Sequence, residues 1–260
     1  MTFVPSDEAV AETLAAVAEP HFLDATLLTV GFRTDPAVVE RLLPPGLEPA
    51  DDPLARAEVI SVGESNCVGA FDGGGLYVRA RRDDREGLYC LSMPMSTDSA
   101  VRWGRETLGE PKKLATVALD REDDRVVGRA ERDRTAILEL AVDLDAEREP
   151  RPGTTTIYHY RALLAVDGSG LAADPELVEV TIESSPTRVE TGTASVTLGS
   201  TAHDPLADLP VEHVRDASLV ETDLVLGARG AGRVDAEAYL PYAFGVGMDD
   251  WPAHANENGD

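Results

Sequence analysis

Two adjacent residues, Lys112 and Lys113, are the only lysines in the 260-residue chain, and the remaining 21 of its 23 Lys and Arg side chains are arginines. A lysine, unlike an arginine, can lose its proton and attack a carbonyl group as a free amine. Burial in an apolar pocket or a nearby cation frees such an amine, which can then condense with a ketone to form an iminium ion. The pair therefore predicts Schiff-base chemistry, with a surface location for both lysines as the alternative.

The other reactive side chains give weaker signals. The five histidines show no HxxxH or HExxH spacing, and Cys67 and Cys90 form no CxxC motif. No metal site is expected from them, and the cysteines are interpreted as buried thiols of a cytoplasmic protein. His159 lies between Tyr158 and Tyr160 in an alternating segment, so it faces either a pocket or the solvent.

The composition restricts the possible partners. A formal net charge of −25 excludes the basic footprint that nucleic-acid binding needs, and it argues against adhesion to an anionic membrane. No segment has the pattern of a membrane span or a signal peptide. At 1 M salt the Debye length is only ~3 Å, which screens such self-repulsion. We interpret the composition as an acidic surface suited to a salt-rich cytoplasm, such as that of a halophilic archaeon.

The elements that must position the lysines are mostly strands. One helix is predicted over residues 6–18, with Ser6 as its N-cap, and a second begins at Asp35-Pro36 and ends before Pro44-Pro45. Alternating segments predict strands at 27–32, 56–62, 76–80, 114–119, 125–131, 135–142, 154–166, 177–184, 188–198 and 219–226. The glycine-rich runs 73–75 and 227–232 are interpreted as turns.

Many strands without regularly intervening helices disfavour a doubly wound nucleotide-binding fold. The predicted class is α+β, mainly antiparallel β, with a closed β-barrel-like sheet system and a few flanking helices. Residues 1–247 are expected to form a single domain, and the acidic segment 248–260 is expected to be a disordered tail.

Several segments, in the same order along the chain, resemble the acetoacetate decarboxylase family. The combination of Gly104-Arg105-Glu106 with Pro111-Lys112-Lys113-Leu114 is the most specific of them. The resemblance covers roughly residues 22–245, and the supporting segments are Phe32-Arg33-Thr34-Asp35, Leu43-Pro44-Pro45, Ala55-Arg56-Ala57-Glu58-Val59-Ile60 and Pro205-Leu206-Ala207-Asp208-Leu209-Pro210-Val211.

This resemblance implies roles for three residues. Lys112 would form the Schiff base, Lys113 would be its partner lysine, and Glu58 would be a pocket carboxylate that places or relays a proton. On a strand the two lysines would face opposite sides, so Lys113 has a second interpretation as a strand anchor held by carboxylates. The resemblance also implies a homo-oligomer. It implies no organic cofactor or metal, because the lysine itself supplies the electron sink.

The chain departs from the family's decarboxylases at two positions. The second pocket glutamate falls on Gly73, and an arginine falls on Ala25. Asp72 is a candidate for substrate binding in place of the glutamate, or else part of a turn. Arg105 is a further candidate for substrate binding, with a structural ion pair to Glu106 as the alternative.

Three functions stay open at this point. The resemblance implies decarboxylation of a small β-keto acid, such as acetoacetate, to a ketone and CO₂. The departures at Gly73 and Ala25 open, as the second alternative, an aldolase-dehydratase that condenses a 2-oxo acid with an aldehyde through the same iminium. A non-catalytic small-molecule binding module on the same fold is the third, and the isolated lysine pair counts against it.

Overall fold

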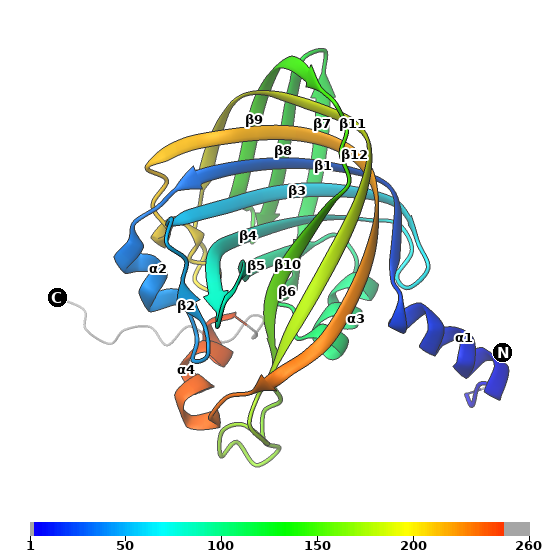
Figure 1. Ribbon diagram of the computed structural model, residues 1–260. Coiled ribbons are helices and arrows are strands. Elements are labelled where there is room, and N and C mark those ends of the chain that lie inside the picture. Colours follow the sequence, from blue (N-terminus) through cyan, green and yellow to red (C-terminus); the bar gives the residue numbers. More distant parts are fainter. Residues whose placement is uncertain (1–2, 247–260) are drawn as a thin grey trace.

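The computed structural model describes residues 3–246, so the predicted disordered tail at 248–260 lies outside the described residues. Figure 1 shows curved strands wrapped around a central space, with short helices at the periphery. The helices are α1 Asp7–Ala18, α2 Pro36–Leu42, α3 Asp98–Leu108, η1 Leu206–Asp208 and α4 Ala236–Val246. The strands are β1 His21–Arg33, β2 Glu48–Pro49, β3 Leu54–Ser65, β4 Phe71–Arg82, β5 Arg85–Met95, β6 Lys112–Leu114, β7 Thr116–Glu122, β8 Arg125–Arg132, β9 Thr135–Arg148, β10 Gly153–Arg161, β11 Glu176–Leu198 and β12 His213–Arg233.

Seven strands close into a barrel in the order β10-β5-β4-β3-β1-β12-β11, because β11 pairs back with β10. Neighbouring strands around this barrel are antiparallel, apart from a short parallel contact between β10 and β5. The first barrel strand, β1, pairs with the last, β12. The expected closed and mainly antiparallel sheet system is confirmed.

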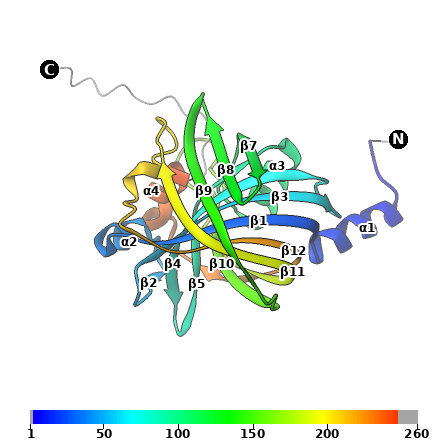
Figure 2. The same ribbon diagram turned by 90° about the horizontal axis from the view of Figure 1, so that it is seen from above.

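A second layer grows out of the barrel wall. The C-terminal half of β11 leaves β10 behind and pairs with β9, which continues the sheet through β8 to β7 (Figure 2). Strand residues alternate between two faces, so the wall strands serve two apolar cores. The outer core, between the wall and this second layer, includes Leu28, Val59 and Leu138. The inner core inside the barrel includes Phe71 and Met93.

The two helices expected from their caps are confirmed. The Ser6 hydroxyl accepts a hydrogen bond from the Ala9 amide at the start of α1, and the Asp35 carboxylate accepts one from the Ala37 amide at the start of α2. Helix α1 buries none of its residues and projects from the barrel (Figure 1). No helix within residues 3–246 is long and apolar enough to cross a membrane.

The interpretation of the glycine-rich runs as turns is wrong. Residues 73–75 lie within β4, and residues 227–232 lie within β12. A Cβ atom on Gly73 would lie 2.8 Å from Cε of Met95, and one on Gly75 would overlap the ring of Tyr77. These glycines therefore permit close packing inside a strand rather than a change of chain direction.

The segments 177–184 and 188–198 also prove to be one strand, β11. Pro186 does not end the strand, because the register with β12 shifts between Pro186 and Arg188 and absorbs the missing backbone donor there.

Candidate active site

Helix α3 sets the position of Lys112. The helix begins at its Thr97 N-cap and ends at Gly109, which has a φ of 72°. The Glu110 amide then donates to the Gly104 carbonyl at 3.2 Å, a hydrogen bond that closes the last turn. Pro111 cannot continue the helix, so the chain turns into β6, which runs parallel to β5.

Strand β6 separates the two lysines. Lys112 lines the cavity of the barrel, whereas the Nζ of Lys113 points to the other face and donates to the His203 carbonyl at 2.6 Å and to Asp204 at 3.1 Å. Asp204 also accepts a hydrogen bond from Arg132 Nε at 2.8 Å. Lys113 thus lies in a buried ion-pair network under β6, and the structure does not bring its amine to the cavity.

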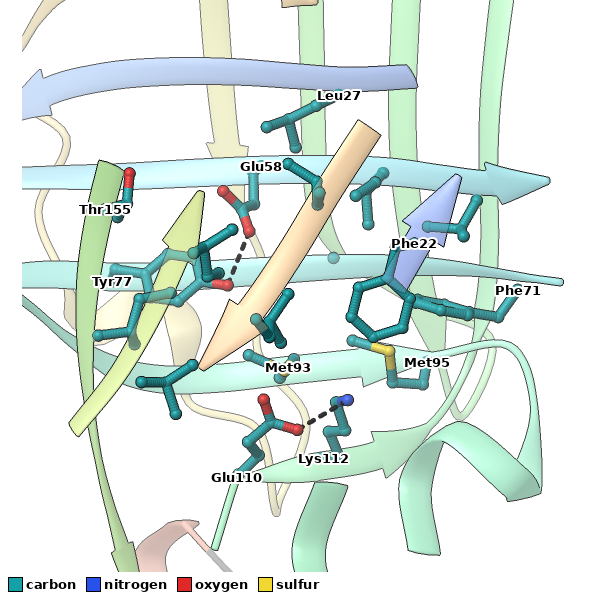
Figure 3. Close-up of a pocket in the computed structure, with 18 of the residues that line it drawn as sticks. Phe22, Leu27, Glu58, Phe71, Tyr77, Met93, Met95, Glu110, Lys112 and Thr155 are labelled. Atoms are coloured by element: carbon teal, nitrogen blue, oxygen red, sulfur yellow. Dashed lines mark hydrogen bonds and ion pairs between the residues drawn. The ribbon is translucent and has the colours of Figure 1, made fainter. Parts of the chain in front are cut away.

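The cavity has a volume of about 150 Å³ and a mainly apolar wall. An apolar protein cavity of that size, ~150 Å³, accommodates a molecule such as benzene. The wall includes Phe22, Ile60, Phe71, Met93, Met95 and Trp103. Figure 3 shows the two polar pairs that interrupt this wall, one on β3 and β4 and the other just before and on β6. The space therefore suits a small organic molecule with few polar groups.

The side chain of Lys112 is buried and forms an ion pair with the carboxylate of Glu110. Its Nζ lies 2.7 Å from Glu110 Oε2, and each of the two side chains is 6% exposed. The Nζ also lies 5.6 Å from the centroid of the Trp103 ring. Both ion-pair partners pack against Gly104 of α3, where an added Cβ would lie 2.8 Å from Lys112 Nζ. The glycine of the Gly104-Arg105-Glu106 segment is thus required for the close approach of the lysine.

His159 faces the cavity from β10, which settles the choice between pocket and solvent. Its ring is buried, and its Nε2 lies 4.0 Å from Glu110 Oε1. Burial lowers the pKa of His159 to about 4, and the charge of Glu110 opposes this only in part. The ring is therefore neutral at pH 7, and neither ring nitrogen has a hydrogen-bond partner within the described residues.

Glu58 occupies a separate polar site on the wall. One of its oxygens accepts a hydrogen bond of 2.7 Å from the Tyr77 hydroxyl, and the other accepts one of 3.0 Å from Arg56 Nε. The Arg56 guanidinium also lies 5.4 Å from the centroid of the Tyr77 ring. Burial, together with the charge of Glu58, raises the pKa of Tyr77 well above its usual value, so Tyr77 stays protonated and donates.

The structure brings together two of the five residues predicted for the site, Lys112 and Glu58. Lys113, Asp72 and Arg105 do not line the cavity. Gly73, one residue after Asp72, lies opposite the cavity-lining Ile60, so the Asp72 side chain points to the other face of β4.

Arg105 contacts the backbone of β6 and not the cavity. Its Nη1 donates to the Lys112 carbonyl oxygen at 3.2 Å, which supports the backbone of the lysine rather than a ligand in the cavity. Ala25, where the resemblance places the family's arginine, is buried in the inner core.

Five polar residues at the cavity were not predicted from the sequence: Arg56, Tyr77, Glu110, Thr155 and Ser184. Arg56 and Glu110 each stand two residues from a predicted site residue, and side chains at that spacing share a face of an extended segment. This spacing was the available signal. Tyr77 carried no comparable signal, because its place opposite Glu58 depends on the register of β3 with β4.

Comparisons with known proteins were made by sequence and by structure. A family model described as acetoacetate decarboxylase (ADC) matches residues 5–235. An acetoacetate decarboxylase from Burkholderia vietnamiensis is 29% identical over 238 residues, which cover 86% of this chain and 95% of the relative.

Two solved structures share the fold at lower identity. Acetoacetate decarboxylase from Legionella pneumophila superposes with a TM-score of 0.75 at 22% identity, over 82% of this chain and 87% of that one. The enduracididine biosynthesis enzyme MppR, solved in complex with pyruvate, gives a TM-score of 0.71 at 18% identity, over 84% of this chain and 91% of that one.

Proposed function

Because the chain belongs to the acetoacetate decarboxylase family, we propose that it is a Schiff-base enzyme that decarboxylates a small β-keto acid such as acetoacetate. Lys112 attacks the ketone carbon and water leaves, which produces an iminium ion. The iminium accepts the electron pair of the breaking C–C bond as CO₂ departs. The resulting enamine is protonated, and hydrolysis releases the ketone and the free lysine.

One observation carries this proposal. The amine of Lys112 lies buried at a cavity of about 150 Å³ with a mainly apolar wall. Such a wall excludes water from the iminium and destabilises a substrate carboxylate relative to the neutral CO₂ that it becomes. Glu58, fixed by Arg56 and Tyr77, is the carboxylate that we assign to protonation of the enamine. We assign Lys113 to anchoring β6 through Asp204.

A second reaction uses the same lysine. The position of the family's second pocket glutamate is Gly73, where a Cβ would meet the side chain of Met95, a residue of the cavity wall. A side chain there would displace Met95, and the lack of a carboxylate at this position opens, as the alternative, an aldolase-dehydratase that condenses a 2-oxo acid with an aldehyde. The structural likeness to MppR, which was solved with bound pyruvate, supports the same alternative.

Borohydride trapping tests the proposal. The protein is incubated with acetoacetate or with pyruvate, reduced, and the adduct is located by tandem mass spectrometry of peptides. We expect the adduct on Lys112 in the parent and none in Lys112→Arg. Lys113→Arg, the matched control at the neighbouring position, should form the adduct as the parent does. Release of CO₂ from acetoacetate identifies the decarboxylase, whereas preferential trapping of pyruvate identifies the aldolase-dehydratase. Absence of any adduct on folded parent protein contradicts both and leaves a binding role.

A further inference from the structure

The carboxylate of Glu110 is the acidic group in contact with the reacting nitrogen of Lys112 (Figure 3). An ammonium ion has no lone pair and cannot attack a carbonyl, so Lys112 must give up a proton before the first bond forms. Glu110 Oε2 lies 2.7 Å from Lys112 Nζ in an ion-pair contact, close enough to receive that proton.

The arrangement is built into the turn between α3 and β6. The Glu110 amide is held by the Gly104 carbonyl, and the Lys112 amide donates to the Glu110 carbonyl at 2.8 Å. Glu110 and Lys112 are two residues apart, on either side of Pro111, and both side chains line the cavity. Any side chain at position 104 would displace both groups. The pair is therefore fixed by the backbone before a ligand arrives.

His159 is a second polar side chain beside Lys112 and Glu110 in the cavity wall. His159 is 2% exposed, lines the cavity, and has no hydrogen-bond partner at either ring nitrogen within the described residues. A buried polar group without a partner is rare in folded proteins, and it is satisfied when a ligand supplies one. The neutral ring lines the same cavity as Lys112, 4.0 Å from Glu110, and its nitrogens are available to a polar atom of a ligand there.

We propose that Glu110 is a catalytic residue that carries the proton of imine formation, an assignment that rests on the proposed Schiff-base function. Glu110 first accepts a proton from the Lys112 ammonium, which leaves a neutral amine and a neutral carboxylic acid. The amine nitrogen bonds to the ketone carbon, and a second nitrogen proton passes to the former carbonyl oxygen, which gives a carbinolamine. Glu110 then returns its proton to the carbinolamine hydroxyl, the C–O bond breaks, and water leaves as the nitrogen lone pair forms the C=N bond.

The charge in the cavity is the same before and after these steps. The cycle starts with an ammonium beside a carboxylate and ends with an iminium and water beside that carboxylate. An isolated charge in a buried site is strongly unfavourable, so a route that keeps the two charges paired is favoured. Glu110 thus also stabilises the iminium as its counter-ion.

Two measurements on Glu110→Gln test this role. The first is exchange of the carbonyl oxygen of acetone with ¹⁸O-labelled water, which needs imine formation but no cleavage of a C–C bond. We expect Glu110→Gln to slow the exchange by on the order of 10²-fold or more, the usual contribution of a positioned acid–base group. The second is acylation of Lys112 by 4-nitrophenyl acetate, which needs a free amine but no dehydration step. We expect faster acylation, because a buried ammonium without its counter-ion loses its proton more readily.

Two further variants make the result specific. Lys112→Arg gives the background for both measurements. Glu190→Gln removes another buried, ion-paired carboxylate, one that is outside the cavity, and should behave as the parent does in both. Slower exchange together with faster acylation supports the proposal. Unchanged exchange in Glu110→Gln overturns it, and so does a parallel loss of exchange and acylation, which indicates a structural role. Parent protein that neither exchanges acetone oxygen nor traps with borohydride contradicts the Schiff-base function itself.

Discussion

At the scale of single residues, the pH dependence of stability depends on His159. The ring is buried and its pKa is lowered from 6.5 to about 4, mainly by that burial. As the pH falls from 6.5 towards 4, the unfolded chain binds a proton at this position while the folded chain does not. Protonation therefore favours unfolding in this window, and the stability is fully retained only above pH 6.5.

We expect His159→Leu to remove this effect. Between pH 7 and pH 4, the free energy of unfolding of the parent should fall by about 3 kcal/mol more than that of His159→Leu, because each pKa unit corresponds to 1.36 kcal/mol. Urea titrations at a series of pH values measure both curves. His213→Leu, at an exposed position at the start of β12, is the matched control and should follow the parent. Parallel curves for the parent and His159→Leu would contradict the burial argument.

A residue of the site could be predicted from the sequence only where its amino-acid type was unusual in this chain or where the family resemblance indicated it. Lys112 stood out because the chain otherwise uses arginine, and the family resemblance indicated Glu58. Glu110 is an ordinary acidic residue in an acidic chain, and its contact with Lys112 depends on the turn at the end of α3. Asp72 was misplaced by one residue, and in a strand one residue reverses the face.

At the scale of elements, β6 is a three-residue strand whose position depends on the network beneath it. Asp204 accepts hydrogen bonds from Lys113, Arg132 and Thr201. Burial opposes the ionisation of Asp204, yet the hydrogen bond from Arg132 and the charge of Lys113 hold its pKa below the usual value. The network therefore joins two buried cations, Lys113 and Arg132, to one carboxylate.

Replacement of Asp204 by asparagine removes the negative charge of the ion pairs that Asp204 forms with Lys113 and Arg132. We expect Asp204→Asn to lower the free energy of unfolding by about 3–5 kcal/mol, the usual effect of removing one partner of a buried ion pair. Asp208→Asn, at an exposed position of η1, is the matched control and should stay within about 0.5 kcal/mol of the parent. Urea denaturation measures both variants, and equal losses would show that Asp204 does not hold the strand.

The local sequence pattern predicted the presence of helices and strands better than it predicted where they begin and end. The alternation of apolar and polar residues identified the successive antiparallel strands β7, β8 and β9. The capping residues identified α1 and α2. Helix α3 was not predicted, although Thr97 caps it and Gly109 ends it, because its helical face is short and was interpreted only as a family motif. Gly73 of β4 was misinterpreted because its role is tertiary, the close contact with Met95 of β5.

At the scale of the whole molecule, charge is the dominant property. The chain has 48 acidic and 23 Lys and Arg side chains, so 25 acidic groups have no basic counterpart by number. Salt has two opposing effects on such a protein. It weakens the exposed ion pairs, which contribute about 0–1 kcal/mol each, and it screens the repulsion among the excess carboxylates. Because the acidic groups are in such excess, we expect the screening of their repulsion to outweigh the loss of ion pairs, so that salt increases the stability of the fold.

The melting temperature should therefore rise with KCl. Most of the rise should occur below about 1 M, where the Debye length shrinks from ~10 Å at 0.1 M to ~3 Å. Calorimetry across a KCl series measures it, and a repeat with NaCl should give the same curve, because screening depends on ionic strength. A melting temperature that is constant or falls with salt would contradict the prediction and assign the greater weight to the ion pairs.

The pairing of β1 with β12 has a consequence for how the molecule is made. Residues 21–33 and 213–233 are neighbours in the barrel wall, although residues 34–212 lie between them in the sequence. Such distant contacts form slowly, and a chain that emerges from the ribosome in order must complete β12 before its first strand has both neighbours. Leu224 and Leu226 of β12 also line the cavity. On the nascent chain Lys112 therefore has no pocket, and the site comes into being only when synthesis of the barrel is finished.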